Sequence, residues 1–161
     1  DRPQPEGHQQ ENHVIDAAEL WRKIGRLSWK QIQAAVEAPK GPLWRNDHSS
    51  SKGINDAVGA GNTGKLKRSL YLVRPSGLVL SKAKEPGYEG KPSRTRVRAR
   101  FKLGGVEYRF AVTDPLLPDR LKDGETKISE ALLCLSLPAG SVGGYCYKLV
   151  ATVITPESAG E

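Results

Sequence analysis

The chain has no methionine, only two cysteines and few aromatic residues, which make up 6% of its 161 positions. Its longest apolar run, Leu149 to Ile154, is far shorter than the roughly 20 residues that a helix needs to cross a bilayer, so no membrane partner is expected. The first residues are polar and include proline, unlike a signal peptide. The missing methionine predicts a fragment, or a chain that begins after a removed segment.

The two cysteines lie twelve residues apart, at Cys134 and Cys146, each within an apolar and strand-like run. Neither has a histidine or a further cysteine at the spacing of a zinc site. We expect free, buried thiols in a reducing cytoplasm, because free cysteine packs as a small apolar side chain. A disulfide between the two strands is the less favoured alternative, and no cofactor is expected.

Positive charge is concentrated in one part of the chain. Between Lys65 and Arg109 there are 13 Lys or Arg residues and three acidic residues, a net charge of +10 (13 − 3). The whole chain carries +7, so the remaining residues sum to −3 (7 − 10). Positive charge confined to one region predicts an anionic partner, whereas charge that only keeps a protein soluble would be spread over the whole chain.

Residues 94–113 predict a β-hairpin. Every second residue from Arg94 to Lys102 is cationic and the residues between them are mostly apolar, the period of a strand with one wet face. Gly104 and Gly105 supply a two-residue turn. Folding about this turn opposes four apolar or aromatic pairs: Leu103 with Val106, Phe101 with Tyr108, Ala99 with Phe110 and Val97 with Val112.

The other face of this hairpin carries the cations. Its expected pairs are Lys102 with Glu107 and Arg100 with Arg109, and two arginines directly opposite are unfavourable unless an anion lies over them. A nucleic-acid phosphate is a natural anion for this face. A charged strand face is also typical of a solvated surface, or of an edge strand protected against aggregation. The concentration of charge favours the phosphate interpretation.

The wider pattern predicts a mainly β chain, α+β overall, with a small barrel after a helical hairpin. Asp16 with Glu19, and Ser28 with Gln31, have the spacing of capping boxes. They predict helices at 16–24 and at 29–37, the second ended by Pro39. Residues 41–65 are rich in Gly, Ser, Asn and Asp and predict a long loop. The expected strands are 69–74, 77–83, 94–103, 106–113, 131–137 and 145–154, with a helical or extended excursion at 115–123.

Two other patterns are weak as functional sites. The helix pair has the outline of a helix-turn-helix, but its second helix has no arginine, and we expect Trp21, Trp29 and Ile32 to be core residues. Residues 46–48, Asn-Asp-His, resemble part of a metal nuclease site without a second histidine at helical spacing or paired acids. We therefore expect no catalytic residue, no metal and no enzyme activity, and a metal-dependent nuclease is the third interpretation.

Tyrosines accompany the basic half of the chain. Tyr71, Tyr145 and Tyr147 lie in expected strands, and stacking on tyrosine beside a cationic groove binds single strands without reading their bases. Tyr145 and Tyr147 share a face with Leu149, which also fits core positions. Lys148 points the other way in the expected strand, so we expect it to meet a ligand.

Several short runs follow one another along the chain: His8–Asn12, Trp21–Gly25, Leu43–Asn46 with Gly53–Asp56, Ser69–Val73, Val112–Pro115, Leu133–Leu137 and Gly144–Ala151. In this order, the runs resemble the dual OB-containing domain family of prokaryotes. The resemblance implies a pair of OB-like barrels and a nucleic-acid-binding role in defence against mobile elements, and it supplies no catalytic residues. Members of that family usually begin with a further β-rich segment, so the resemblance also implies that the first barrel is incomplete or absent here.

Together, the residues and the resemblance predict an OB-like barrel at 66–156. A helical hairpin and loop at 1–65, the remnant of the incomplete first unit, would precede it, and a tail at 157–161 would follow. We expect a non-enzymatic module for nucleic acid, with single strands or RNA favoured and the choice of DNA or RNA left open. The alternative is an interaction or scaffolding module whose basic face meets an acidic protein partner. The expected contact residues are Arg94, Arg96, Arg98, Arg100, Lys102, Arg109, Lys148 and Tyr71.

Overall fold

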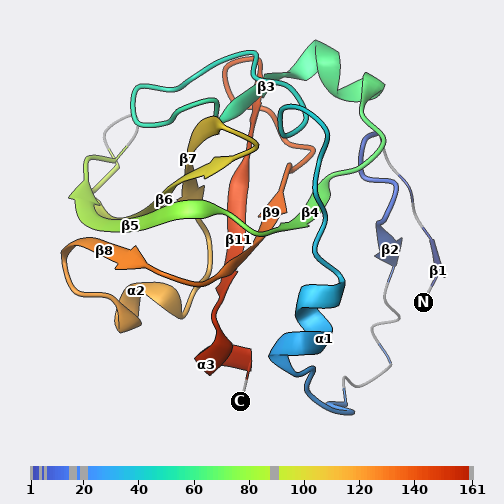
Figure 1. Ribbon diagram of the computed structural model, residues 1–161. Helices are drawn as coiled ribbons and strands as arrows, with labels where there is room; N and C mark the ends of the chain where they lie inside the picture. Colours follow the sequence, from blue (N-terminus) through green and yellow to red (C-terminus); the bar gives the residue numbers. More distant parts are fainter. Residues whose placement is uncertain are drawn as a thin grey trace.

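In the computed structural model, short strands form most of the regular structure (Figure 1). The structure describes residues 2–3, 5, 7–14, 18, 22–87 and 91–159. The strands of its main sheet are β4 (Leu70–Val73), β5 (Ser76–Glu85), β6 (Arg94–Leu103), β7 (Val106–Val112), β8 (Gly124–Ile128), β9 (Leu132–Ser136) and β11 (Leu149–Ile154). The other elements are β1 (Arg2–Pro3), β2 (His13–Val14), α1 (Trp29–Ala34), β3 (Ala57–Gly59), the 3-10 helix η1 (Ala60–Lys65), α2 (Leu117–Arg120), β10 (Tyr145–Tyr147) and α3 (Pro156–Ala159).

The main sheet has seven strands in the order β4-β9-β11-β7-β6-β5-β8. Strands β5, β6 and β7 form an antiparallel meander, and β7 then pairs in parallel with β11. β11 pairs antiparallel with β9, which in turn pairs with β4. β8 adds an edge strand beside β5, while β3 and β10 form a separate two-stranded sheet.

Strands β4 and β5 are two parts of one bent path, because only Arg74 and Pro75 separate them. Pro75 has no backbone N–H and a fixed φ, so a regular ladder cannot run through it. Since β4 lies at one end of the sheet order and β5 near the other, this bend turns the sheet back on itself without closing it. A strongly bent, open sheet is consistent with the expected OB-like domain, which is a partly open barrel.

The predicted hairpin is confirmed, and so is its register. β6 and β7 join through Gly104 and Gly105, whose φ values of 56° and 80° lie in the region that glycine adopts without strain. The four apolar pairs expected from the sequence all occur: Val97 with Val112, Ala99 with Phe110, Phe101 with Tyr108 and Leu103 with Val106.

The inward face of this hairpin lies in the hydrophobic core. Phe101, Tyr108 and Phe110 are buried, with ring centroids 5.4 to 5.6 Å apart. Leu43 comes from the segment before the expected barrel and is also fully buried there, and its backbone N–H donates to the Tyr108 hydroxyl at 3.0 Å. Residues on both sides of the expected boundary after residue 65 thus share one core, and the division into units stays a prediction.

One of the two predicted helices is present, and it is shorter than expected. α1 begins after Ser28, which forms the predicted capping box with Gln31. It ends at Ala34, with Ala35 as its C-cap, and the chain then turns along β4, where the Glu37 N–H donates to the Leu72 carbonyl at 2.8 Å. Residues 22–27, at the end of the other expected helix, are not helical, and most of that helix, with Trp21, lies outside the described residues. The helical hairpin is therefore not confirmed.

Trp29 is a core residue, as predicted. It is buried in a small cluster with Leu132 and Ala159, and Ile32 packs against this cluster. No helix in the described part of the chain is long and apolar enough to span a bilayer.

The remaining differences from expectation concern short elements. β3 and η1 lie within the stretch 41–65 that predicted only a loop, and β8 has no expected counterpart. β8 (Gly-Glu-Thr-Lys-Ile) lacks an apolar alternation, and it is fixed by pairing with β5 at the sheet edge. The expected strand 145–154 is interrupted at Lys148, while both cysteines are free, Cys146 buried and Cys134 half-buried.

Candidate nucleic-acid interface

Most of the predicted contact residues share the outward face of β6 and β7. The cations of β6 alternate with its buried positions, and Arg109 joins them from β7. The register sets Arg100 opposite Arg109 and Lys102 opposite Glu107, as predicted. The hairpin face is defined here by six side chains: Arg94, Arg96, Arg98, Arg100, Lys102 and Arg109.

Strand β5 brings an acidic residue to the hairpin face that reasoning from sequence missed. Glu85 is the cross-strand partner of Arg94 and reaches diagonally to Arg98, whose Nε and Nη2 donate to its two oxygens at 2.7 and 2.9 Å. The side chains of Arg98 and Glu85 are only 14% and 15% exposed. Hydrogen bonding from Arg98 holds the pKa of Glu85 below its usual value. Arg98 is therefore engaged within the protein, unlike its neighbours.

The other cations of the hairpin face form weaker ion pairs within the protein, or none with a described carboxylate. Arg94, Arg100 and Lys102 are exposed, and Arg100 has only a loose pair with Glu107 at 3.9 Å, of the exposed kind that contributes little. Arg94, Arg96, Lys102 and Arg109 form no ion pair with a carboxylate of the described residues. Burial and the neighbouring Arg94 lower the pKa of Arg96. A bound anion would relieve this crowding of like charge.

A hollow of about 340 Å³ opens on the same side of the sheet. Arg100 and Arg109 line it together with Glu107 and Glu125, so its charges balance. Ile54 forms part of its wall, fixed by two backbone hydrogen bonds with Arg109 of 3.0 and 3.2 Å. The excess positive charge of the hairpin face therefore lies outside this hollow.

Lys148 does not lie on the surface, so its predicted orientation is wrong. It is 1% exposed, and its Nζ donates to Asn46 Oδ1 at 2.8 Å and to the Asn55 carbonyl at 2.7 Å. The same nitrogen lies 5.5 and 5.7 Å from the ring centroids of Tyr108 and Phe110. Burial lowers the pKa of Lys148 to about 7. Lys148 thus anchors the loop before β3 to the core.

A β-bulge explains this error. The pairing of β11 with β9 is irregular between Val150 and Thr152, which shifts the alternation of inward and outward side chains. Cys146 and Val150 are buried before the irregularity and Val153 after it, so a continuous period of two assigns Lys148 to the wrong face. Tyr145 and Tyr147 are accordingly half-buried, and Tyr145 stacks on His48 with centroids 4.4 Å apart.

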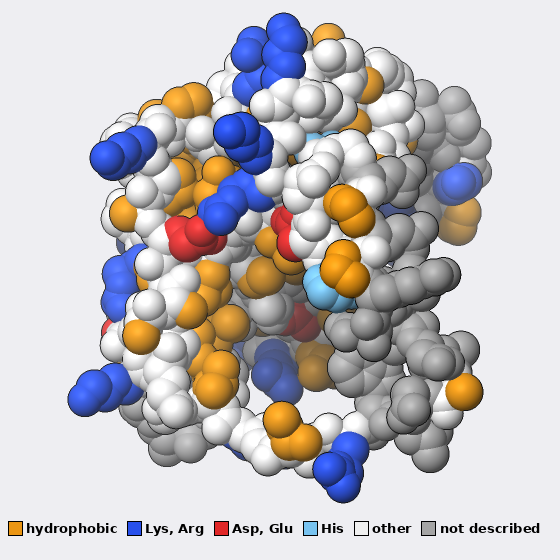
Figure 2. All heavy atoms as spheres, turned by 90° about the vertical axis from the view of Figure 1, so that its right-hand side faces the viewer, with side chains coloured by type: hydrophobic (Ala, Val, Ile, Leu, Met, Phe, Trp, Pro, Cys, Tyr) orange, Lys and Arg blue, Asp and Glu red, His pale blue; other side chains and the backbone are white. Residues whose placement is uncertain are grey.

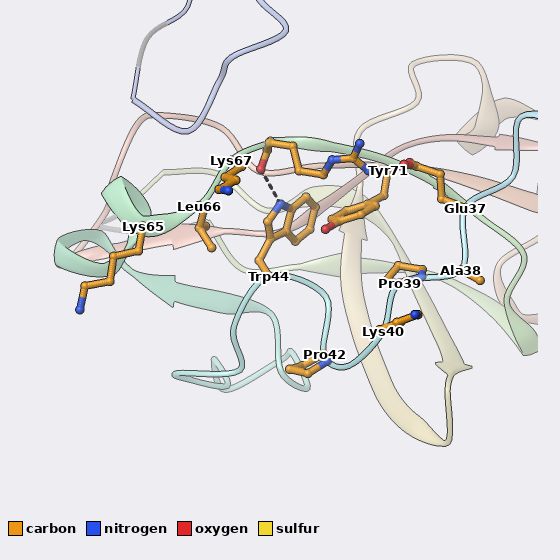
Figure 3. Close-up of a pocket in the computed structure, with 11 residues that line it drawn as sticks. Glu37, Ala38, Pro39, Lys40, Pro42, Trp44, Lys65, Leu66, Lys67 and Tyr71 are labelled. Atoms are coloured by element: carbon orange, nitrogen blue, oxygen red, sulfur yellow. Dashed lines mark hydrogen bonds and ion pairs between the residues drawn. The ribbon is translucent and has the colours of Figure 1, made fainter.

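Tyr71 lies outside the hairpin face: it belongs to β4 and lines a hollow that no residue of that face lines. Its ring packs edge-on against Trp44, with centroids 5.2 Å apart and an interplanar angle of 63°. The Arg68 guanidinium carbon lies 5.0 Å from the Tyr71 centroid. The two aromatic residues line a hollow of about 630 Å³, shown in Figure 3. The sequence signal for this second site is the run Lys65-Leu-Lys-Arg68 just before β4.

The Asn-Asp-His run has structural contacts of its own. Asp47 accepts hydrogen bonds from Gly59 N–H at 3.0 Å, from Asn62 at 2.9 Å and from Arg45 Nε at 3.1 Å. These bonds hold the pKa of Asp47 below its usual value, against the opposing effect of burial. Within the described ranges, no group of three or more His, Cys, Asp or Glu residues is placed to hold a metal ion.

The family model described as Dual OB-containing domain matches residues 1–153. No curated protein and no solved structure gives a significant match. The match covers nearly the whole chain, in agreement with the bent, open β-sheet described above. The chain therefore belongs to the dual OB-containing domain family.

Proposed function

We propose that this chain is a non-enzymatic module that binds nucleic acid through phosphate contacts on the hairpin face. Its membership of a family of OB-containing domains supports a nucleic-acid-binding role, because OB folds commonly bind oligonucleotides. The observation that carries the choice of face is the register of β6 and β7. It sets Arg100 against Arg109 on a face where most cations lack an acidic partner among the described residues.

The residues of the hairpin face have different roles in this proposal. Arg98 is a positioning residue, because Glu85 already occupies its guanidinium. The phosphate contacts fall to the other five: Arg94, Arg96, Arg100, Lys102 and Arg109. Contacts to phosphates fix the position of the ligand and supply affinity, but they do not read sequence. The module should therefore bind strands of different sequence with similar affinity.

A salt titration tests the proposal. Binding to single-stranded DNA, single-stranded RNA and duplex DNA would be measured at several salt concentrations. Five neutralised phosphates give a log-log slope of roughly −3.5 to −4.5, since each contributes about 0.7 to 0.9. Arg94→Ala and Arg100→Ala should each reduce the magnitude of the slope by about 0.7 to 0.9, the contribution of one phosphate contact. The comparison of the three ligands also decides between DNA and RNA.

Lys84→Ala is the matched control. Lys84 is an exposed cation of β5, and its pairing with Thr95 places it on the opposite side of the sheet from the hairpin face. It should leave affinity and slope nearly unchanged. If the Arg94→Ala/Arg100→Ala double variant folds and binds with the wild-type slope, the hairpin face is a solvated surface. An acidic protein partner would then be the better explanation of its charge.

A further inference from the structure

The hollow beside β4 combines aromatic rings with positive charge. It lies between the loop after α1 and the segment that leads into β4. Figure 3 shows the rings of Trp44 and Tyr71 next to each other at its centre, with Lys65 and Lys67 toward one side and Lys40 toward the other. This hollow shares no lining residue with the hairpin face.

The charge around the aromatic pair has one dominant sign. The lining includes the cations Lys40, Lys65, Lys67 and Arg68 and the single acid Glu37, a net of +3 (4 − 1). On the side of the molecule that carries η1, Lys and Arg side chains lie at the top, along one edge and at the bottom, with hydrophobic side chains among them (Figure 2). A ligand that matches both features has a flat apolar part and a negative part.

Trp44 is held in place against a backbone preference. Its φ of 53° lies in the left-handed region, which a bulky residue rarely adopts. Two contacts maintain this conformation: the indole Nε1 donates to the Arg68 carbonyl at 2.9 Å, and the preceding Leu43 is buried in the core. Strained residues of this kind are concentrated at binding sites, where the surrounding structure preorganises them.

Arg68 is also fixed before any ligand arrives. Its guanidinium forms an ion pair with Glu37, and the Glu37 backbone N–H is bonded to the Leu72 carbonyl of β4. This arrangement keeps a cation beside the Tyr71 ring. The Tyr71 hydroxyl forms no hydrogen bond with a described residue and can donate to a ligand.

We propose that the hollow of Trp44 and Tyr71 holds one unpaired nucleotide of a single strand. The base stacks on the half-buried ring of Tyr71, which packs against the buried ring of Trp44, and the flanking phosphates lie at Lys40, Lys65 and Lys67. This inference rests on the proposed nucleic-acid-binding function and adds a preference for unpaired bases. A base inside a duplex cannot reach the pocket unless it leaves the stack, which costs free energy. Neither the phosphate contacts of the hairpin face nor an acidic protein partner would need these rings.

An abasic strand separates base stacking from phosphate contact. The wild-type protein would be titrated with a single-stranded oligonucleotide and with a strand of the same length in which every base is missing. Both present the same phosphates to the hairpin face. The intact strand should bind about 5- to 150-fold more tightly, the factor that corresponds to the roughly 1–3 kcal/mol of one stacked base. Tyr71→Leu should abolish this difference, whereas Tyr71→Phe, which keeps the ring, should retain most of it.

Tyr147→Leu is the matched control, because Tyr147 is another half-buried strand tyrosine and does not line the hollow. It should preserve the preference for the intact strand. Thermal unfolding would verify that each variant is folded. Tryptophan fluorescence of the wild type gives a readout that needs no substitution at Tyr71. A base stacked on Tyr71 lies beside Trp44, one of three tryptophans, so it should quench part of the emission, and an abasic strand should not.

The outcomes separate this pocket from the proposed function. Equal affinity of the wild type for intact and abasic strands would overturn the pocket and leave phosphate binding by the hairpin face intact. A preference that survives in folded Tyr71→Leu protein, or quenching that the abasic strand reproduces, would also overturn it. Absence of binding to either strand would overturn both proposals.

Discussion

Arg98 and Glu85 form a two-point ion pair across β5 and β6, with both side chains largely withdrawn from water. Arg94, on the same alternating row, is exposed and forms no ion pair with a described carboxylate, although Glu85 is its cross-strand partner. Two arginines that look equivalent in the sequence thus differ in what they do. Arg98 joins two strands, and Arg94 is available to a ligand.

We predict that Arg98→Ala lowers the free energy of unfolding by about 1–3 kcal/mol, because it leaves the Glu85 carboxylate without its charged donor. Arg94→Ala, the matched control on the same strand, should change stability by less than about 0.5 kcal/mol. Urea denaturation measures both. Equal losses in the two variants would contradict the distinction drawn from the ion pair.

The same pair predicts a change in acid stability. The folded pKa of Glu85 is depressed, mainly by its hydrogen bonds from Arg98, so the pair's contribution is present above the ordinary glutamate pKa of about 4.3 and is lost as pH falls through the folded value. Wild type should therefore lose stability below about pH 4.3 more steeply than Arg98→Ala. Urea midpoints between pH 3 and pH 6 measure the two slopes, and parallel curves would contradict this role for Glu85.

Lys148 predicts a pH dependence of the same sign in a higher pH range. Its folded pKa of about 7 lies below the value of about 10.4 in an unfolded chain, so between these values the unfolded state binds more protons and stability rises with pH. The expected gain is about 1 kcal/mol per pH unit, close to the 1.4 kcal/mol of one full proton. In the neutral form, the two N–H groups still satisfy Asn46 and Asn55.

Lys148→Met should remove this gain, whatever its effect on absolute stability. The measurement is the difference between wild type and variant in free energy of unfolding from pH 7 to pH 8.5. The window stops at pH 8.5 because burial raises the pKa of the Cys146 thiol in the folded protein. Above the usual thiol pKa of about 8.5, the thiol ionises in the unfolded chain but not in the folded one, and this lowers stability. The same pH slope in both proteins would assign the dependence to other groups.

Asp47 should matter for stability and not for catalysis. Its carboxylate accepts hydrogen bonds from Gly59, Asn62 and Arg45, which ties the loop before β3 to η1. Asp47→Asn should lower the free energy of unfolding by about 0.5–1.5 kcal/mol. Incubation of single strands with wild type and magnesium or manganese should give no cleavage. Metal-dependent cleavage that Asp47→Asn abolishes would overturn the non-enzymatic proposal.

The hairpin can be predicted from the sequence because the residues that determine it are close together along the chain. Alternation in residues 94–103 and the Gly104-Gly105 turn together determine the pairing and the register. The contact between Glu85 and Arg98 depends instead on how β5 pairs with β6 across a longer connection, which alternation does not specify. The predicted orientation of Lys148 is wrong for a third reason: a bulge further along the strand shifts the alternation of inward and outward side chains.

The aromatic hollow depends on contacts between distant parts of the chain. Trp44 and Tyr71 are 27 positions apart (71 − 44) and belong to a loop and a strand, so no single periodic pattern joins them. The backbone of Trp44 is a further obstacle, because its left-handed φ is imposed by the core around Leu43 and is not a preference of tryptophan. In the sequence, the expected contact residue Tyr71 and the basic run before β4 indicate part of this site, but not Trp44 beside them.

The two proposed contact regions predict separable effects on binding. Arg100→Ala removes a phosphate contact, so it should lower affinity and reduce the magnitude of the salt slope by about 0.7 to 0.9. Tyr71→Leu removes a stacked base, so it should lower affinity for an intact single strand by a similar factor at every salt concentration and leave the slope unchanged. Because the hollow of Trp44 and Tyr71 shares no lining residue with the hairpin face, the free-energy effects of the two changes should add within about 0.5 kcal/mol in the double variant. Salt titrations of the wild type, both single variants and the double variant measure all four quantities. A change of slope in Tyr71→Leu would mean that the hollow binds phosphate alone, and strong non-additivity would mean that the two regions form one site.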